Sequence, residues 1–192
     1  SLDRDALEVH MILGNLYREK GQVGKAVSVH QDLLQRRGLS GLEHAYVLLC
    51  LGLDYKRGGF VDRAAEAFHE VLRLDPENEY ALLNLQRLQE EQHRWTEASD
   101  TRRRLAELTD GEEQPQGQAI LAFLENEIGL EAMRRKDTAE AVKHFRSAID
   151  LDARAVPAYV NLGDVWAAEG RIAEAVSIWE SLVQAVPDRA YL

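Results

Sequence analysis

The side chains that could carry out chemistry are scattered along this sequence. Six histidines could serve as bases or metal ligands, at His10, His30, His44, His69, His93 and His144. Their spacing is not that of a metal site, so surface or packing roles are expected and no metal is predicted. Carboxylate pairs such as Glu90 and Glu91 are adjacent, so they point in different directions on a helix and do not suit paired acid–base catalysis.

The other candidate motifs are equally unpromising for catalysis. Cys50 is the single cysteine and lies in an apolar stretch, so we expect a buried thiol whose pKa is raised by burial. The stretch GGFVDRA, residues 58–64, lacks the Lys-Ser/Thr pair of a phosphate-binding loop. No Ser-His-Asp or Cys-His arrangement has a familiar nucleophile context. The sequence therefore predicts a protein that is not an enzyme and needs no cofactor.

Composition and charge narrow the class of partner. The chain has 192 residues, 45% of them hydrophobic, which is typical of a globular protein with a sizeable core. Its net charge of −10 argues against nucleic acid and anionic lipid. The longest apolar run is too short to span a bilayer, so no membrane insertion of this segment is predicted. One cysteine fits a reducing, cytoplasmic setting, and the start at Ser1 indicates a piece of a longer protein.

One fourteen-residue sequence motif recurs and indicates the helices of the fold. LGNLYREKGQVGKA begins at Leu13, LGLDYKRGGFVDRA at Leu51, and LGDVWAAEGRIAEA at Leu162. Aligning the position after the leucine gives Gly14, Gly52, Gln86, Gly129 and Gly163, in steps of 38, 34, 43 and 34 residues. A period of this size is typical of stacked helical hairpins, in which small residues let two helices cross closely and aromatic residues fill the space around them.

The repeated pattern resembles the tetratricopeptide repeat family. In the fifth repeat Leu162, Gly163, Trp166, Ala175 and Pro187 occupy the consensus positions. The resemblance implies an all-α, α-α superhelix of about five helix-turn-helix repeats, forming a single domain over residues 1–192. The expected repeats are 7–40, 45–78, 79–112, 122–155 and 156–189. Gln86 and Arg102 replace the expected glycine and aromatic residue, so we expect looser packing in the third repeat.

Two connections are longer than the basic period. The sequence Ser40-Gly-Leu-Glu43 has the form of a capping box, which would start the second repeat's first helix early and account for residues 41–44. The other insertion covers residues 113–121. There Pro115 is expected to mark a boundary after which the next helix begins before the usual point.

The first two repeats are similar to a narrower group, the bacterial lipopolysaccharide assembly protein B family. Asn15, His30, Gln31, Asp54 and Arg63 lie within the distinctive stretches. This resemblance implies repeats on the cytoplasmic face of the bacterial inner membrane that limit lipopolysaccharide synthesis by bringing the lipid A deacetylase to a membrane protease. The membrane helix and the zinc module of that family have no counterpart in these residues.

The inner surface of such a stack is the expected binding site for a protein or peptide. The second, fifth, ninth and twelfth residues of each repeat should face it. The candidate residues for the partner-binding groove are Met11, Asn15, Tyr46, Leu49, Leu53, Tyr80, Leu83, Arg87, Phe123, Asn126, Leu130 and Met133. Many of them are apolar, which is typical of an interaction surface, although burial against neighbouring helices is an equally plausible fate for any one of them. Met11 stands where a clamp for chaperone tails needs lysine, so an amphipathic helix or extended segment is the favoured ligand.

Two functional readings remain open at this point. The first is a non-catalytic adaptor, by resemblance a regulator of lipopolysaccharide synthesis that holds a client in its groove. The alternative is a generic scaffold or a self-assembling structural protein, in which the C-terminal repeat, around Trp179 and Leu182, forms a homo-oligomer.

Overall fold

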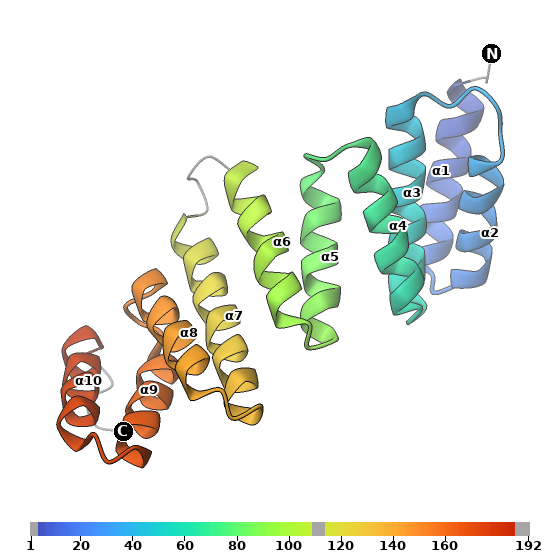
Figure 1. Ribbon diagram of the computed structural model, residues 1–192. Coiled ribbons are helices and arrows are strands. Elements are labelled where there is room, and N and C mark those ends of the chain that lie inside the picture. Colours follow the sequence, from blue (N-terminus) through green and yellow to red (C-terminus); the bar gives the residue numbers. More distant parts are fainter. Residues whose placement is uncertain (1–3, 109–113, 187–192) are drawn as a thin grey trace. The chain divides into compact units, whose positions relative to one another are not determined.

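The protein is built from α-helices alone in the parts that the structure describes. The computed structural model describes residues 4–108 and 114–186, and these ranges hold ten helices and no strand (Figure 1). The helices are α1 (Arg4–Glu19), α2 (Val23–Leu34), α3 (Gly41–Arg57), α4 (Val61–Leu74), α5 (Glu79–Glu91), α6 (Trp95–Leu108), α7 (Gln114–Arg134), α8 (Thr138–Leu151), α9 (Val156–Ala168) and α10 (Ile172–Ala185). They form five helix-turn-helix repeats, so the all-α repeat fold predicted from the sequence is confirmed.

The chain divides into two compact units, Ser1–Gln92 and His93–Leu192. In the N-terminal unit α1 packs with α2, α2 with α3, α3 with α4 and α4 with α5. In the C-terminal unit the same order runs from α6 to α10. The division falls in the third repeat. There Gln86 replaces the glycine of the repeat pattern, and Arg102 replaces its aromatic residue.

Close helix crossings explain why glycine recurs in the repeated phrase. A Cβ atom added to Gly52 would lie 2.6 Å from Cε1 of Phe68, and one added to Gly129 would lie 2.5 Å from Cε1 of Phe145. A Cβ atom added to Gly163 would lie closer still to Trp179, and one added to Gly14 closer still to His30. Any larger residue would therefore push the two helices of a repeat apart or displace a ring in the core.

The turn inside each repeat uses a left-handed backbone conformation. Gly21, Gly59 and Gly170 have φ of 72°, 75° and 77°. The third and fourth repeats have His93 and Lys136 at the corresponding turn, with φ of 57° and 64°. Glycine adopts this conformation without steric penalty, so its recurrence here follows from the turn geometry.

Both long connections lengthen the helix that follows them. Ser40 caps α3: its Oγ accepts a hydrogen bond from the Glu43 amide at 3.3 Å, and a Glu43 carboxylate oxygen accepts one from the Ser40 amide at 2.8 Å. The predicted capping box is therefore confirmed. Helix α7 begins at Gln114 and carries Pro115 in its first turn, where proline needs no amide partner. Residues 109–113 and 187–189, which belong to the predicted third and fifth repeats and the second connection, lie outside the described residues.

Each unit has its own buried core. In the N-terminal unit, Leu7, Met11, Leu33, Val47 and Cys50 form one cluster. Burial raises the pKa of the Cys50 thiol to about 11, the neighbouring Asp54 adding to this effect and Arg18 opposing it, so the thiol stays protonated at neutral pH. In the C-terminal unit, Phe145, Leu162, Val165 and Trp166 lie at the centre of a larger cluster with Ala132, Ala141 and Ala175.

Candidate protein-binding surfaces

The predicted groove residues of the N-terminal unit differ in their exposure according to their position in the repeat. Residues at the second position, Tyr46 and Tyr80, are exposed. At the fifth position Met11 and Leu49 are buried, and Leu83 is half-buried. The ninth position holds Asn15 and Leu53, which are half-buried, and Arg87, which is exposed. Helices α1 and α3 contact each other directly, and Met11 packs there with Val47 and Cys50. The exposed surface of this unit therefore rests on the second and ninth positions.

The C-terminal unit follows the same rule at its own predicted residues. Phe123, at the second position, is exposed, and its ring packs edge-on against Trp95 with centroids 6.0 Å apart. Asn126, at the fifth position, is buried, and its Oδ1 accepts a hydrogen bond from Nδ2 of Asn161 at 2.8 Å, joining α7 to α9. Leu130 and Met133 are half-buried and pack against the core cluster. Among the predicted groove residues of this unit, Phe123 is thus the exposed one.

An apolar cleft with acidic edges lies between α1 and α3. Met11, Ile12 and Tyr46 form its apolar part, and Glu8 and Glu43 stand beside them. Because the two carboxylates flank an aromatic and an aliphatic side chain, this cleft suits a ligand side chain that combines an apolar stem with a positive charge.

A second cleft in the same unit is basic. Arg18, Lys56 and Arg57 line it together with Glu19, Leu53 and Asn84. The Lys56 ammonium donates a hydrogen bond to Oδ1 of Asn84 at 3.2 Å. Burial lowers the pKa of Lys56, and nearby Arg87 lowers it further against the opposing effect of Glu91. The three basic side chains that line this cleft favour a carboxylate ligand.

A buried polar cluster holds Arg18 at the edge of this basic cleft. Asp54 is fully buried and accepts a hydrogen bond from Nη1 of Arg18 at 2.8 Å. Its other oxygen lies 2.5 Å from Nδ1 of His30, which is also fully buried. Nη2 of Arg18 donates to Oδ1 of Asn15 at 2.8 Å. The sequence placed Asn15 on the surface but gave no sign that an aspartate on α3 would be buried against a histidine 24 residues earlier.

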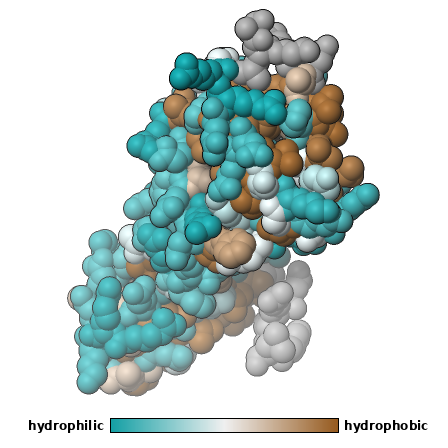
Figure 2. Space-filling model, turned by 90° about the vertical axis from the view of Figure 1, so that its right-hand side faces the viewer, coloured by the Kyte–Doolittle hydropathy of each residue, from teal (hydrophilic) through white to brown (hydrophobic). Residues whose placement is uncertain are grey.

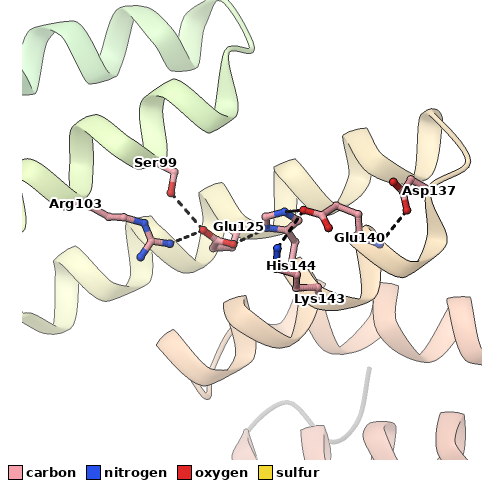
Figure 3. Close-up of polar contacts among 7 residues, drawn as sticks. All are labelled: Ser99, Arg103, Glu125, Asp137, Glu140, Lys143 and His144. Atoms are coloured by element: carbon pink, nitrogen blue, oxygen red, sulfur yellow. Dashed lines mark hydrogen bonds and ion pairs between the residues drawn. The ribbon is translucent and has the colours of Figure 1, made fainter.

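The C-terminal unit contains a separate ion-pair cluster around Glu125 (Figure 3). Glu125, on α7, accepts hydrogen bonds from Nη2 of Arg103 at 2.7 Å and Oγ of Ser99 at 3.3 Å, both on α6. Its other oxygen lies 2.7 Å from Nδ1 of His144 on α8, whose Nε2 is 3.0 Å from Glu140. Burial raises the pKa of Glu125, but the hydrogen bonds from His144 and Arg103 outweigh it, so the pKa lies below its usual value.

The clusters around Asp54 and Glu125 join neighbouring helices, and their geometry suits helix packing and binding more than catalysis. The Glu125 carboxylate is occupied by partners on both sides, and so is that of Asp54. Within residues 4–108 and 114–186, no group of three or more His, Cys, Asp or Glu side chains could hold a metal ion. None of the helices in those residues is both long and apolar enough to cross a bilayer.

Comparisons with known proteins agree with the repeat reading. Profiles described as tetratricopeptide repeat match residues 50–113 and 126–190, and another with the same description matches residues 9–40. Lipopolysaccharide assembly protein B of Escherichia coli K12 is 28% identical over 181 residues, which are 94% of this chain and 46% of that protein. The Haemophilus influenzae protein of that name is 26% identical over 182 residues, 94% of this chain and 44% of its own length.

Solved structures show the same fold at lower identity. The crystal structure of MamA protein has a TM-score of 0.59 and 19% identity, covering 96% of this chain and 93% of that one. MamA from Desulfovibrio magneticus RS-1 gives a TM-score of 0.53 and 14% identity over 96% of this chain and 97% of its own. The chain spans less than half the length of the lipopolysaccharide assembly proteins that it resembles. Its repeats, their period and the profile matches together establish that the chain belongs to the tetratricopeptide repeat family.

Proposed function

We propose that this chain is a non-catalytic scaffold that binds a client protein through the inner helices of its N-terminal unit. The observation that carries this proposal is the pair of clefts on α1, α3 and α5, one apolar with acidic edges and one basic. Tyr46 is exposed beside Glu8 and Glu43, and Tyr80 is exposed on α5; exposed aromatic side chains of this kind are typical of a binding surface.

The two clefts define the chemistry and the direction of the client segment. Tyr46 and Lys56 are ten residues apart on α3, which corresponds to about 15 Å along the helix axis. A segment lying along α3 would place a basic residue near Glu8 and Glu43 and an acidic residue near Lys56. Apolar side chains between them would contact Tyr46 and Leu53. We infer an amphipathic client segment with opposite charges at its two ends.

The resemblance to lipopolysaccharide assembly protein B supports a more specific role. By that resemblance the chain works at the cytoplasmic face of the bacterial inner membrane, and the client is the lipid A deacetylase, whose capture limits lipopolysaccharide synthesis. The support is 28% identity over 94% of this chain, with a charged, partly apolar surface available for a protein. Arg87, Phe123, Leu130 and Met133 would extend contacts with the same or a second protein.

Binding of the purified deacetylase from the same organism, measured by biolayer interferometry, tests the proposal. Tyr46→Ala and Lys56→Glu should each weaken binding by about tenfold or more, because an aromatic anchor and a partly buried charge are typical hot spots. Lys143→Glu is the matched control: it makes the same charge change on an exposed second helix, α8, and should leave binding unchanged.

The outcomes separate the two parts of the proposal. No binding by the unmodified chain would reject the deacetylase as its client. Binding that Tyr46→Ala and Lys56→Glu leave intact would instead reject these clefts as the surface.

A further inference from the structure

A small pocket lies between α7 and α9, the first helices of the fourth and fifth repeats (Figure 1). This α7–α9 pocket has a volume of about 100 Å³. Most of the residues that line it have small side chains, namely Ala119, Ala122, Ala155, Pro157 and Ala158. Phe123 also lines it and is exposed. None of these residues belongs to the two clefts of the N-terminal unit, so the pocket is a separate candidate site.

Several residues of the pocket are smaller than those at the same repeat positions in the N-terminal unit. The second position is Tyr46 or Tyr80 there and Pro157 in the fifth repeat, and the first position is Leu7 there and Ala122 in the fourth. Large apolar side chains reach the surface of the N-terminal unit among hydrophilic ones, on the face that Figure 2 shows. Alanine and proline have no side-chain rotamers to lose on binding, so the α7–α9 pocket is preformed.

The volume of the pocket selects the size of the group that it holds. An apolar cavity of about 150 Å³ is large enough for a benzene ring. A pocket of about 100 Å³ is smaller than that and suits a branched aliphatic group. The side chains of leucine, isoleucine and valine have this size and shape.

Asp152 makes one side of the pocket acidic. Its Oδ1 accepts a hydrogen bond from the Arg154 amide at 2.8 Å, which holds the carboxylate in place. Among the described residues that line the pocket, none is basic. Burial raises the pKa of Tyr159 on α9, and Asp150 and Asp152 raise it further, so both carboxylates act on this part of α9. The charge of the pocket therefore complements a cation.

A pair of amides beside the pocket favours an extended ligand. Asn126 lines the pocket, and its Oδ1 accepts the hydrogen bond from Nδ2 of half-buried Asn161. The Oδ1 of Asn161 has no hydrogen-bond donor within the part of the chain that the structure describes. An extended segment has backbone N–H groups that can donate to such an oxygen, whereas a helix uses its own N–H groups internally.

We propose that the α7–α9 pocket binds one leucine, isoleucine or valine side chain of an extended protein segment, and that a lysine or arginine two residues away pairs with Asp152. In an extended segment, residues two apart project from the same side and are separated by about 7 Å. Both side chains therefore reach the same pocket. The acidic side of the pocket favours this segment over one with acidic residues. The site goes beyond the client surface proposed on α1, α3 and α5, and either can fail without the other.

NMR of the alanine methyl groups of the full chain, titrated with synthetic peptides, tests the proposal. The probe is the peptide acetyl-Ser-Leu-Ser-Lys-Ser-amide. Its addition should cause saturable shifts at Ala119, Ala122 and Ala158, which line the pocket. Replacing the leucine of the peptide with alanine should weaken binding about tenfold or more, because the buried aliphatic group is lost. Phenylalanine in that place should also weaken binding, because its ring exceeds the pocket.

The charge is tested in the peptide and in the chain. Replacing the lysine of the peptide with norleucine should weaken binding by about threefold, the effect of one partly exposed ion pair. Asp152→Asn keeps an Oδ1 that can accept the Arg154 amide but removes the charge, so the lysine and norleucine peptides should bind this variant equally.

An exposed pair of alanines gives a matched test of the pocket itself. Ala119→Leu adds a larger side chain at the pocket and should abolish peptide binding. Ala106→Leu makes the same change on the exposed side of α6, in the same unit, and should leave binding unchanged.

The results that would overturn the proposal differ from those that concern the N-terminal unit. Absence of saturable shifts at the three methyl groups, or equal binding of the leucine and alanine peptides, would reject the pocket as a site. A preference for lysine that persists in Asp152→Asn would reject Asp152 as its partner. The cleft between α1 and α3 is also apolar and acidic, so peptide binding that Tyr46→Ala abolishes would place the peptide there instead. Peptide binding at the pocket by a chain that does not bind the deacetylase would reject only the proposed client.

Discussion

Replacing the buried pair of His30 and Asp54 tests whether the repeat register explains the core of the N-terminal unit. Both side chains are fully buried, and their nearest atoms lie 2.5 Å apart. Their equivalents are Phe68 and Leu88 one repeat later. The double variant His30→Phe, Asp54→Leu therefore converts a polar pair into the apolar pair that the same chain already uses.

The structure gives the size of each step. Asp54→Leu removes the acceptor of both Arg18 and His30, so a buried imidazole loses its partner; breaking a buried pair in this way costs about 3–5 kcal/mol. His30→Phe leaves Asp54 with Arg18 and should cost less, about 1.5–3 kcal/mol for one hydrogen bond to a charged group. The double variant should lie within about 1 kcal/mol of the unmodified chain or above it, because apolar replacements of buried pairs are often neutral or stabilising.

Urea denaturation can follow the two units separately. All three tryptophans, Trp95, Trp166 and Trp179, lie in the C-terminal unit, so their fluorescence reports that unit, while far-UV circular dichroism reports both. Asp54→Leu should lower the transition seen by circular dichroism and leave the fluorescence transition in place. If the double variant is destabilised by the sum of the single effects, the two side chains are not coupled and the register argument is wrong.

Two further predictions concern the C-terminal unit. The pKa of Glu125 is lowered in the folded state, so the unfolded state binds more protons as the pH falls; its contribution to stability is present above the ordinary carboxyl pKa of 4.5 and is lost below it. Glu125→Gln should flatten the acid side of the stability–pH curve measured by thermal melting, and an unchanged curve would contradict this assignment. Gly129→Ala should destabilise the unit by about 1–3 kcal/mol in urea melts, despite the better helix propensity of alanine, because its Cβ would lie 2.5 Å from the buried Phe145 ring. Adding Phe145→Leu should recover part of that loss, and no recovery would mean that the ring is not the obstacle.

The period of the sequence was enough to predict the helices because local and tertiary requirements coincide in a repeat. The phrase that contains Gly52 and Gly59 specifies both a close crossing and a left-handed turn, and each is a short-range property. The capping box at Ser40 is likewise local, which is why the early start of α3 could be predicted from four residues.

The surface was harder to predict because exposure depends on neighbouring repeats. Leu49 belongs to the repeat positions expected in the groove, but it is buried in the packed structure. The sequence analysis did not include Asn84, because it follows the expected position Leu83 by one residue. Its place in the cleft is seen only from its hydrogen bond with Lys56. The burial of Asp54 could not be predicted from its own helix, because it depends on His30 in another helix.

The cluster around Asp54 links the core to the proposed binding surface. A buried ion pair is weak evidence for stability, because removing charges from water offsets most of their attraction. Here the pair has a second effect: Asp54 and Asn15 both accept hydrogen bonds from the Arg18 guanidinium and hold it at the basic cleft, which Arg18 lines. An arginine already held in place loses less side-chain entropy on binding a carboxylate than a free one does. The next junction has Phe68 and Leu88 at the equivalent positions. We therefore propose that the polar pair of His30 and Asp54 is used to hold a charge in place for a ligand.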